Sequence, residues 1–394
     1  MNREILNSEV QEYISNHLTA DVHKIAMAKS PFQNVSPAEL SNQISAKNKS
    51  MRKLPSWYGS NFIYYPALLS IEQCSSEVTA LYKSTLAVGK RLIDLTGGFG
   101  VDAYYFAKRL TSVTHCEINT GLSEIAAYNA LVMLRKNIRF LATDGLEYLK
   151  SGTEDFDTIY IDPARRNTSG KVFMLKDCTP NVTLNLDLLL SKSQRIIIKT
   201  APLLDITSGL KELKQVSEVH VVSVKNECKE LLWIIDHDKP ANQTAKIIAV
   251  TLNEITKTFS FYRGEEELTV PDEARLAGYL YEPDAALLKS GGFALIAPRY
   301  GLQKLHHQTH LYVSMSINTN FPGRIFKIKN VISTSLLKKQ KDLKGNVIVR
   351  NYPDHAELLI KKYKIKPDNR NFLIFTHSTI EGNVIIDSEI IQHY

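Results

Sequence analysis

Short apolar runs alternate with longer stretches of helical character through the middle of the chain. Runs of this kind, flanked by helices, are typical of strands buried on both faces of a parallel sheet. The seven predicted strands are residues 92–95, 112–117, 138–142, 158–162, 195–199, 219–224 and 231–235. The last two are joined by the polar link KNECKE, which permits an antiparallel return but no helical crossover. The pattern predicts an α/β fold built on a seven-stranded sheet.

The regions on either side of this sheet have different patterns. Residues 1–88 read as helical, and Ser36-Pro37-Ala38-Glu39 has the spacing of a capping box at a helix start. After the sheet, residues 246–261 alternate like strands, residues 273–291 are predicted to form a helix, and the segment beyond FPGRIF has the pattern of a small α+β domain. The predicted domains are a helical region at 1–88, the α/β sheet at 89–238, an α+β domain at 239–320 and a basic α+β domain at 321–394.

Composition narrows the class of protein. The chain has 394 residues, of which 44% are hydrophobic and 23% charged, as expected for a globular protein of more than one domain. No apolar run approaches the roughly 20 residues needed to cross a bilayer, and the charged N-terminus lacks a signal core. The four cysteines form no C-x-x-C pair, which argues against a zinc site or a disulfide framework. We therefore expect a cytoplasmic protein without a membrane partner or a metal.

Positive charge is concentrated near the C-terminus. The whole chain has a net charge of +7, yet residues 321–370 hold thirteen Lys or Arg against four acids, a local excess of +9. A concentrated basic block of this kind is expected on a surface that binds phosphate groups. A solvated basic face without a partner is the alternative.

The first predicted strand, residues 92–95, lies within the sequence RLIDLTGGFG. The glycines after the strand allow the backbone to pass close to a ligand. The run from Gly98 to Ala103 satisfies G-x-G-x-x-G/A, and Glu117 follows about twenty residues later, so an NAD-dependent oxidoreductase is one interpretation. Three observations point away from it. A helical region precedes the strand, Asp94 would repel a pyrophosphate, and the third and fourth strands lead into Asp144 and Asp162.

Acids in register after successive strands, together with DLTGGFG, resemble the class I S-adenosylmethionine-dependent methyltransferases over about residues 71–236. The resemblance implies a Rossmann-like fold and S-adenosyl-L-methionine as cofactor. In that family pattern the first motif holds the methionine end, Glu117 accepts the ribose hydroxyls, Asp144 binds the adenine amine and Asp162 lies beside the departing methyl. The implied cofactor-binding residues are Asp94, Thr96, Gly97, Gly98, Gly100, Glu117, Ile118, Asp144, Gly145 and Asp162.

The nature of the methyl acceptor is read from DPARRN, which follows the fourth strand. Enzymes that methylate exocyclic amines commonly have D/N-P-P followed by an aromatic residue, whereas Ala164 and Arg165 occupy those positions here. We expect Asp162, Pro163 and Arg165 to be catalytic. Arg165 and Arg166 are expected to bind substrate, either by stacking on a base or by gripping a phosphate.

Two further sequences allow alternative interpretations. DPAR with CTP suggests the covalent mechanism of pyrimidine carbon-5 methyltransferases, but Cys178 precedes the fifth strand, whereas the family's cysteine follows it. The run EQCSSE at residues 72–77 is similar to segments that close the cofactor pocket of some RNA-guanine methyltransferases and cap hypermethylases, and a solvated helix face is the equal alternative. His306, His307 and His310 have helical spacing, but a surface cluster is favoured over a metal site.

The last third of the chain resembles the ferredoxin-like and THUMP-like domains of a group of bacterial class I methyltransferases. The matching words are YLYEPDAALLKSG, KLHHQTHLYVS, FPGRIF and KGNVIVRNYPDHAELLIKKYKIK. THUMP domains bring RNA to modifying enzymes, so the resemblance implies methylation of structured RNA, a tRNA or rRNA base. A non-catalytic RNA-binding protein on a methyltransferase scaffold is the remaining alternative.

Overall fold

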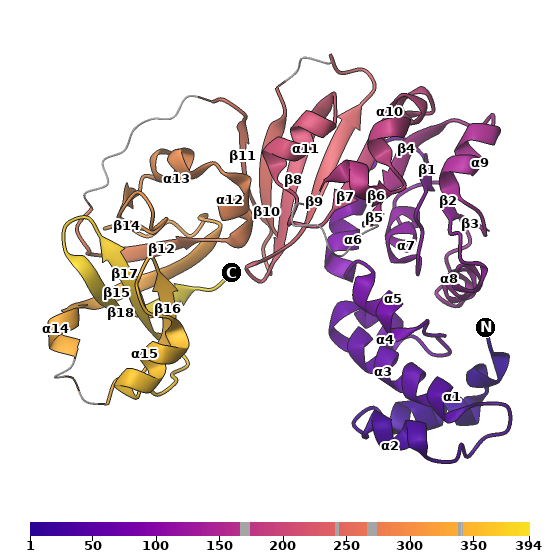
Figure 1. Ribbon diagram of the computed structural model, residues 1–394, viewed down its shortest axis with the longest axis horizontal. Helices are drawn as coiled ribbons and strands as arrows, with labels where there is room; N and C mark the ends of the chain where they lie inside the picture. Colours follow the sequence, from indigo (N-terminus) through magenta and orange to yellow (C-terminus); the bar gives the residue numbers. More distant parts are fainter. Residues whose placement is uncertain (166–173, 241–243, 266–273, 338–339, 341) are drawn as a thin grey trace. The chain divides into compact units, whose positions relative to one another are not determined.

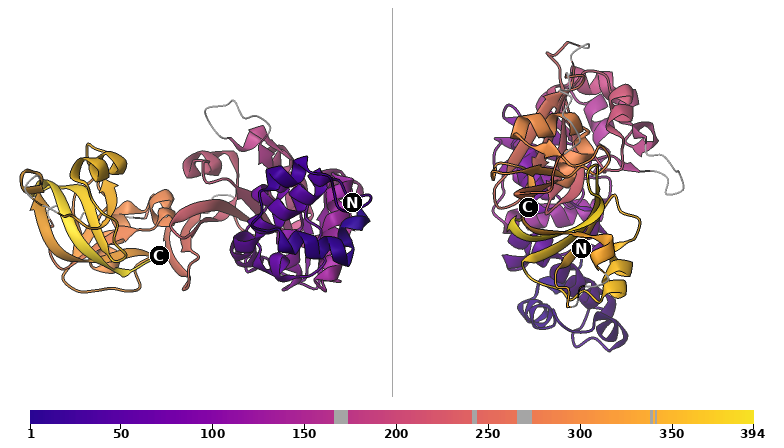
Figure 2. Two further views of the ribbon diagram at one scale, coloured as in Figure 1. Left: turned by 90° about the horizontal axis from the view of Figure 1, so that it is seen from below. Right: turned by 90° about the vertical axis from the view of Figure 1, so that its left-hand side faces the viewer.

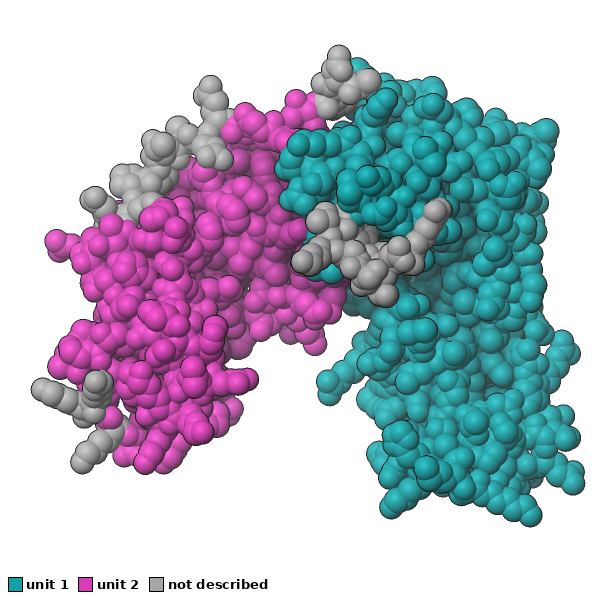
Figure 3. All heavy atoms as spheres, in the orientation of Figure 1, with its two compact units in different colours: residues 1–217, 232–243 teal, residues 218–231, 244–394 magenta. Residues whose placement is uncertain are grey.

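The computed structural model describes residues 1–165, 174–240, 244–265, 274–337, 340 and 342–394 (Figure 1). Residues 1–217 and 232–243 form one compact unit, and residues 218–231 and 244–394 form a second (Figure 3). We call them unit 1 and unit 2. The described residues include no helix that is both long and apolar enough to span a bilayer.

Unit 1 begins with a helical body, as predicted. Its elements are η1 (Arg3–Leu6), α1 (Ser8–Asn16), α2 (Val22–Met27), α3 (Pro37–Lys53), α4 (Pro55–Gly59), α5 (Leu68–Gln73) and α6 (Glu77–Ser84). The predicted capping box is confirmed, because Ser36 and Glu39 bond reciprocally at the start of α3. The buried core of this body includes Leu40, Ile44 and Trp57 and continues into Phe99 and Tyr104 beside the glycine loop. The N-terminal helices and the loop therefore share one core. The ribbon draws these helices in indigo, at the start of the chain (Figures 1 and 2).

The predicted parallel strands of unit 1 are confirmed. They are β1 (Arg91–Asp94), β2 (Ser112–Cys116), β3 (Ile138–Leu141), β4 (Phe156–Ile161) and β7 (Ser193–Thr200), hydrogen-bonded in the order β7-β4-β1-β2-β3. The helices between and after them are α7 (Val101–Ala107), α8 (Thr120–Val132), α9 (Gly145–Ser151), α10 (Val182–Ser191) and α11 (Ile206–Glu212). In the parallel register Asp94 pairs with His115 on one side and Tyr160 on the other. The strands thus end at a common edge, where residues that follow them meet.

A small ladder lies beyond the end of β4. It pairs β5 (Ala164–Arg165) with β6 (Cys178–Thr179), which follows the short helix η2 (Leu175–Asp177). Arg166, expected to bind substrate, lies outside the described residues.

The sheet continues beyond the predicted strands. β8 (Val216–Val224) and β9 (Glu227–Asp236) are joined by Lys225 and Asn226, both with positive φ, as in a type I′ turn; this confirms the predicted antiparallel return. β10 (Lys246–Thr251) pairs parallel with β8, and β11 (Lys257–Tyr262) pairs antiparallel with β10. Among the described residues the sheet therefore has nine strands, because the strand-rich segment after residue 245 adds two to the seven predicted.

The rest of unit 2 is a second sheet with helices. Its strands are β12 (Tyr279–Pro283), β13 (Gln303–Lys304), β14 (Tyr312–Ser314), β15 (Gly323–Ser333), β16 (Asn346–Arg350), β17 (Asn371–Ser378) and β18 (Gly382–Gln392), and its helices are α12 (Ala285–Ser290), α13 (Phe293–Tyr300), α14 (Thr334–Leu337) and α15 (Ala356–Tyr363). The described strands are ordered β13-β14-β12-β15-β18-β17-β16. Along β17, Phe372 and Ile374 enter one core while Leu373 and Phe375 enter another, so both faces of this sheet are covered.

The helix predicted over residues 273–291 is wrong for residues 274–284, none of which is helical. The sequence YLYEP forms β12, which pairs with β14 and β15 and buries Leu280 and Tyr281 completely. A strand paired on both sides accommodates these aromatic and branched side chains better than an isolated helix face does. The helix begins only at Ala285, after Asp284 caps its first turn.

Candidate active site

The glycine loop connects β1 to α7 and lies directly on β2. Gly98 and Gly100 have φ values of +55° and +83°, which side-chain-bearing residues rarely adopt. A Cβ on Gly97 would lie 2.2 Å from Nε2 of the buried His115, and one on Gly145 would lie 2.6 Å from the Cα of Leu95. The glycines therefore let the loop, β2 and the start of α9 approach one another closely.

For the cofactor that the sequence resemblance implies, we expect Gly97→Ala to weaken binding of its product S-adenosylhomocysteine by more than tenfold, because the new methyl group displaces the loop from the His115 ring. Calorimetry measures the loss. The double variant Gly97→Ala/His115→Ala removes the clashing ring and is expected to recover part of the affinity, whereas Gly59→Ala, with no atom near its Cβ, serves as the control. Equal affinity of wild type and Gly97→Ala would contradict this account of the loop.

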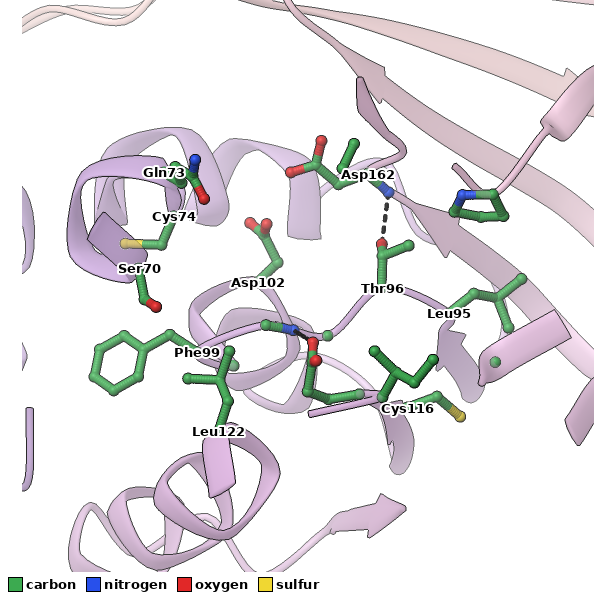
Figure 4. A pocket seen from close by; sticks show the side chains of 18 of the residues that line it. Ser70, Gln73, Cys74, Leu95, Thr96, Phe99, Asp102, Cys116, Leu122 and Asp162 are labelled. Atoms are coloured by element: carbon green, nitrogen blue, oxygen red, sulfur yellow. Dashed lines mark hydrogen bonds between the residues drawn. The ribbon is translucent and has the colours of Figure 1, made fainter. Parts of the chain in front are cut away.

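A cavity of about 740 Å³ opens in front of the loop (Figure 4). Nine of the ten predicted cofactor-binding residues line it, and the tenth, Asp94, is only 1% exposed. The lining also includes Ser75 and, across the cavity from Thr96 in the close-up, Ser70, Gln73 and Cys74. The structure thus brings together the residues that follow successive strands and closes the space with the EQCSSE segment.

Asp94 is buried beside this cavity, next to the lining residues Leu95 and Thr96. Burial raises the pKa of its carboxyl well above the usual range, and the backbone N–H of Thr96, which donates to Oδ1 at 3.0 Å, opposes that rise. The negative charges of Asp102, Asp162 and Glu117 raise the pKa further. A cation placed among these carboxylates would be stabilised, whereas an anion would be repelled.

Glu117 and Asp144 are held in place by backbone N–H groups. The two carboxylate oxygens of Glu117 accept from Gly98 at 2.9 Å and from Asn119 at 2.8 Å. Oδ1 of Asp144 accepts from Leu146 and Glu147 and caps the start of α9. A carboxylate oxygen can accept more than one hydrogen bond, so these contacts orient both acids without exhausting their capacity. Beside them Ile118 lines the cavity with 73% of its surface exposed, offering an apolar face.

Asp162 lies at the end of β4 and is fixed from two sides. Its backbone N–H donates to Oγ1 of Thr96 at 2.7 Å, and its Oδ2 accepts from Nζ of Lys199 at 2.5 Å. Lys199 is the penultimate residue of the adjacent strand β7 and also lines the cavity. The sequence analysis assigned Lys199 no role. Its position directly after the apolar residues Ile196 to Ile198, at the same sheet edge as Asp162, could have indicated one. Pro163 is buried, and Arg165 lies in β5, where its backbone alone is described.

A buried polar network lies behind the cavity and was also missed. Lys83 of α6 is fully buried and lies 3.1 Å from Oδ1 of Asp102, while its Nζ donates to Ser75 at 2.7 Å. Oδ2 of Asp102 accepts from Ser75 at 2.8 Å and from Tyr160 at 3.0 Å. The network connects α6 of the helical body, α7 after the glycine loop, and β4.

The structure also bears on the two alternatives left open. Glu77 of EQCSSE is buried and accepts from the hydroxyls of Tyr105 and Ser56, which favours the pocket-closing interpretation over a solvated face. Cys178 is fully buried in β6, and the residues that line the cavity include its neighbours Thr179 and Pro180 but not Cys178 itself. This arrangement gives no support to covalent catalysis.

Within the described residues, no three His, Cys, Asp or Glu side chains are grouped as metal ligands.

Comparison with a solved structure decides the family. The crystal structure of a "putative methyltransferase" from Porphyromonas gingivalis W83 is 30% identical to this chain, covers 99% of both chains and superposes with a TM-score of 0.87. The chain belongs to this family of class I methyltransferases. A family described as a ferredoxin-like domain matches residues 279–322, in agreement with the resemblance noted for the last third of the chain.

A second methyltransferase relative matches only part of the chain. An "uncharacterized RNA methyltransferase" from Mycoplasma mobile is 28% identical over 184 residues, which are 43% of this chain. The aligned segment spans half the length of that relative.

Proposed function

We propose that this methyltransferase uses S-adenosyl-L-methionine to methylate a base of structured RNA. The observation that carries the choice of cofactor is the acidity of the cavity, whose lining includes Asp102, Glu117, Asp144 and Asp162. S-adenosylmethionine bears an ammonium, a sulfonium and a ribose but no phosphate, so it suits an acidic cavity. The pyrophosphate of NAD would face the same carboxylates, which disfavours the oxidoreductase interpretation.

The residues present fit this cofactor. Asp94 and the backbone of Gly97 to Gly100 would hold its methionine end, Glu117 its ribose hydroxyls, and Asp144 with Ile118 its adenine. The cofactor supplies an electrophilic methyl group. Asp162, fixed by Thr96 and Lys199, would position the nucleophile and stabilise charge that develops on it.

The RNA substrate is supported by the charge of unit 2 and by the Mycoplasma relative. Arg324 and Arg350 from the basic block bind the buried Glu282, so part of that block is structural. Other members are exposed and form no ion pair with a described residue: Lys327, Lys344, Lys361 and Lys364. Such cations can bind RNA phosphates without reading sequence. We infer that unit 2 engages tRNA or rRNA.

The test measures cofactor and substrate separately. Calorimetry is expected to show binding of S-adenosylhomocysteine and none of NADH. Radiolabelled S-adenosylmethionine should then transfer its methyl group to total RNA from cells that lack the gene, and mass mapping of nucleosides identifies the product. NADH binding would overturn the cofactor assignment, while RNA binding without methyl transfer would favour the non-catalytic alternative.

We expect cofactor affinity to rise with pH. Asp94 must be ionised to pair with the cofactor ammonium, and its raised pKa keeps it protonated in the free protein well above the usual carboxyl range. Affinity for S-adenosylhomocysteine should therefore increase by up to about tenfold per pH unit below that raised pKa, since binding releases one proton. Asp94→Asn should bind more weakly with a flat profile, whereas the control Asp238→Asn, at an exposed position, should keep the wild-type slope.

A further inference from the structure

A second hollow, of about 670 Å³, lies wholly within unit 2. Asn351 and Tyr352 follow β16, His377 lies near the end of β17, Asn383 is the second residue of β18, and His306 and His307 come from the turn after β13. Strands β16 and β17 are parallel and connected through α15, so the hollow lies at their carboxyl ends. Ligands of open α/β sheets bind at such ends.

Flat rings dominate the walls of this hollow. The His306 ring lies 4.1 Å from that of His307 with 35° between their planes, and 5.0 Å from that of His377, nearly perpendicular to it. The half-buried Tyr352 ring packs edge-on against Phe375 of the core, which fixes its orientation. Planar side chains at fixed angles are suited to stacking on a planar ligand.

The polar atoms are arranged for hydrogen bonding. Nδ1 of His377 bonds Oδ1 of Asn383 at 2.7 Å, and because that oxygen only accepts, Nε2 of a neutral His377 is an acceptor. Nδ1 of His306 accepts from the backbone of Gln308 at 3.1 Å, which makes its Nε2 a donor. The buried Thr309 holds this arrangement, since its hydroxyl donates to the His377 carbonyl and accepts from Asn351.

The lining chemistry selects the class of ligand. The lining residues include no Lys, Arg, Asp or Glu, so neither a phosphate nor a cationic ligand has a charged partner there. No metal-binding group was found over the described part of the chain. Rings for stacking, the acceptor nitrogen of a neutral His377 and three side-chain amides, those of Gln308, Asn351 and Asn383, match the face and edge of a nucleobase.

We propose that this hollow binds an unpaired nucleobase of the RNA substrate, separately from the methyl-transfer cavity. The proposal rests on the proposed RNA-directed function and assigns unit 2 a base-binding site in addition to its phosphate-binding lysines. Free nucleotides share the same base chemistry, so the experiment distinguishes the two sources.

Fluorescence anisotropy with labelled single-stranded pentaribonucleotides (A5, C5 and U5) tests this on the full chain. His307→Ala and His377→Ala are expected to weaken binding of at least one pentamer about tenfold, the usual loss for one stacked base. His393→Ala, an exposed histidine of unit 2 outside the hollow, should bind like wild type. Thermal unfolding of each variant verifies that the fold is intact.

Wild-type affinity in both hollow variants, or no binding of any pentamer by the wild type, would overturn the proposal. AMP competing as strongly as A5 would assign the hollow to free nucleotides, and stabilisation by ZnCl2 that both variants lose would assign it to a metal; either result rejects the proposed ligand. Methyl transfer to total RNA is measured in parallel. If both hollow variants keep methyl transfer and wild-type pentamer affinity, only the base-binding role of the hollow is rejected. If the wild type transfers no methyl group to RNA, the proposed function is rejected.

Discussion

Asp162→Ala is expected to lower methyl transfer by about 100- to 1,000-fold while S-adenosylhomocysteine still binds. The carboxylate lies at the end of β4 on the cavity wall, and removal of one preorganised group that stabilises developing charge costs this much in other enzymes. The backbone N–H of residue 162 still reaches Oγ1 of Thr96, so the loop should keep its shape. Single-turnover transfer of a labelled methyl group, with calorimetry alongside, separates the two effects.

Lys199 supplies the matched comparison for that site. Lys199→Met leaves Asp162 in place without its ammonium partner, so turnover should fall, though less than in Asp162→Ala. Asp238→Ala, at an exposed carboxylate, is the control. Unchanged turnover in Asp162→Ala would remove this residue from the chemistry, and unchanged turnover in Lys199→Met would reduce that lysine to packing.

The strands and their trailing acids could be predicted because both signals are local. Each parallel strand is a short apolar run, and the residue that follows it falls at the same sheet edge as its neighbours. Asp94, Glu117 and Asp162 could therefore be placed near one another before the fold was known. The additional pairing of β10 with β8 could not, since no local signal specifies which edge of a sheet a later strand joins.

The network around Asp102 shows a different limit. Lys83 is hydrophilic, and Asp102 belongs to the G-x-G-x-x-A run, so local pattern gives neither residue a special role. They meet because α6 packs beside α7 and shares its core. The prediction for β12 failed for a related reason. By composition YLYEP suits either a helix or a strand, and only pairing with the neighbouring strands β14 and β15 makes it a strand.

Lys83→Met is expected to destabilise the protein by about 3–5 kcal/mol, because it leaves the carboxylate of Asp102 largely buried without its counter-charge. The double variant Lys83→Met/Asp102→Asn removes both charges and should recover a large part of that loss, although the new amide would still meet Ser75 and Tyr160. Urea unfolding of the four proteins in this cycle measures the coupling free energy.

The position of the network gives this cycle a second readout. Ser75 bonds both charged groups and lines the cavity, so Lys83→Met should also weaken S-adenosylhomocysteine binding under conditions where the variant is fully folded. Lys49→Met, which removes an exposed ion pair with Glu72, is the control and should resemble wild type in both measurements. Additive free energies with unchanged cofactor affinity would mean that the network neither stabilises the fold as a unit nor positions the pocket. Strong coupling with weakened binding would make the N-terminal helical body a required part of the cofactor site, since its buried lysine would act on the ligand through Ser75 and Asp102.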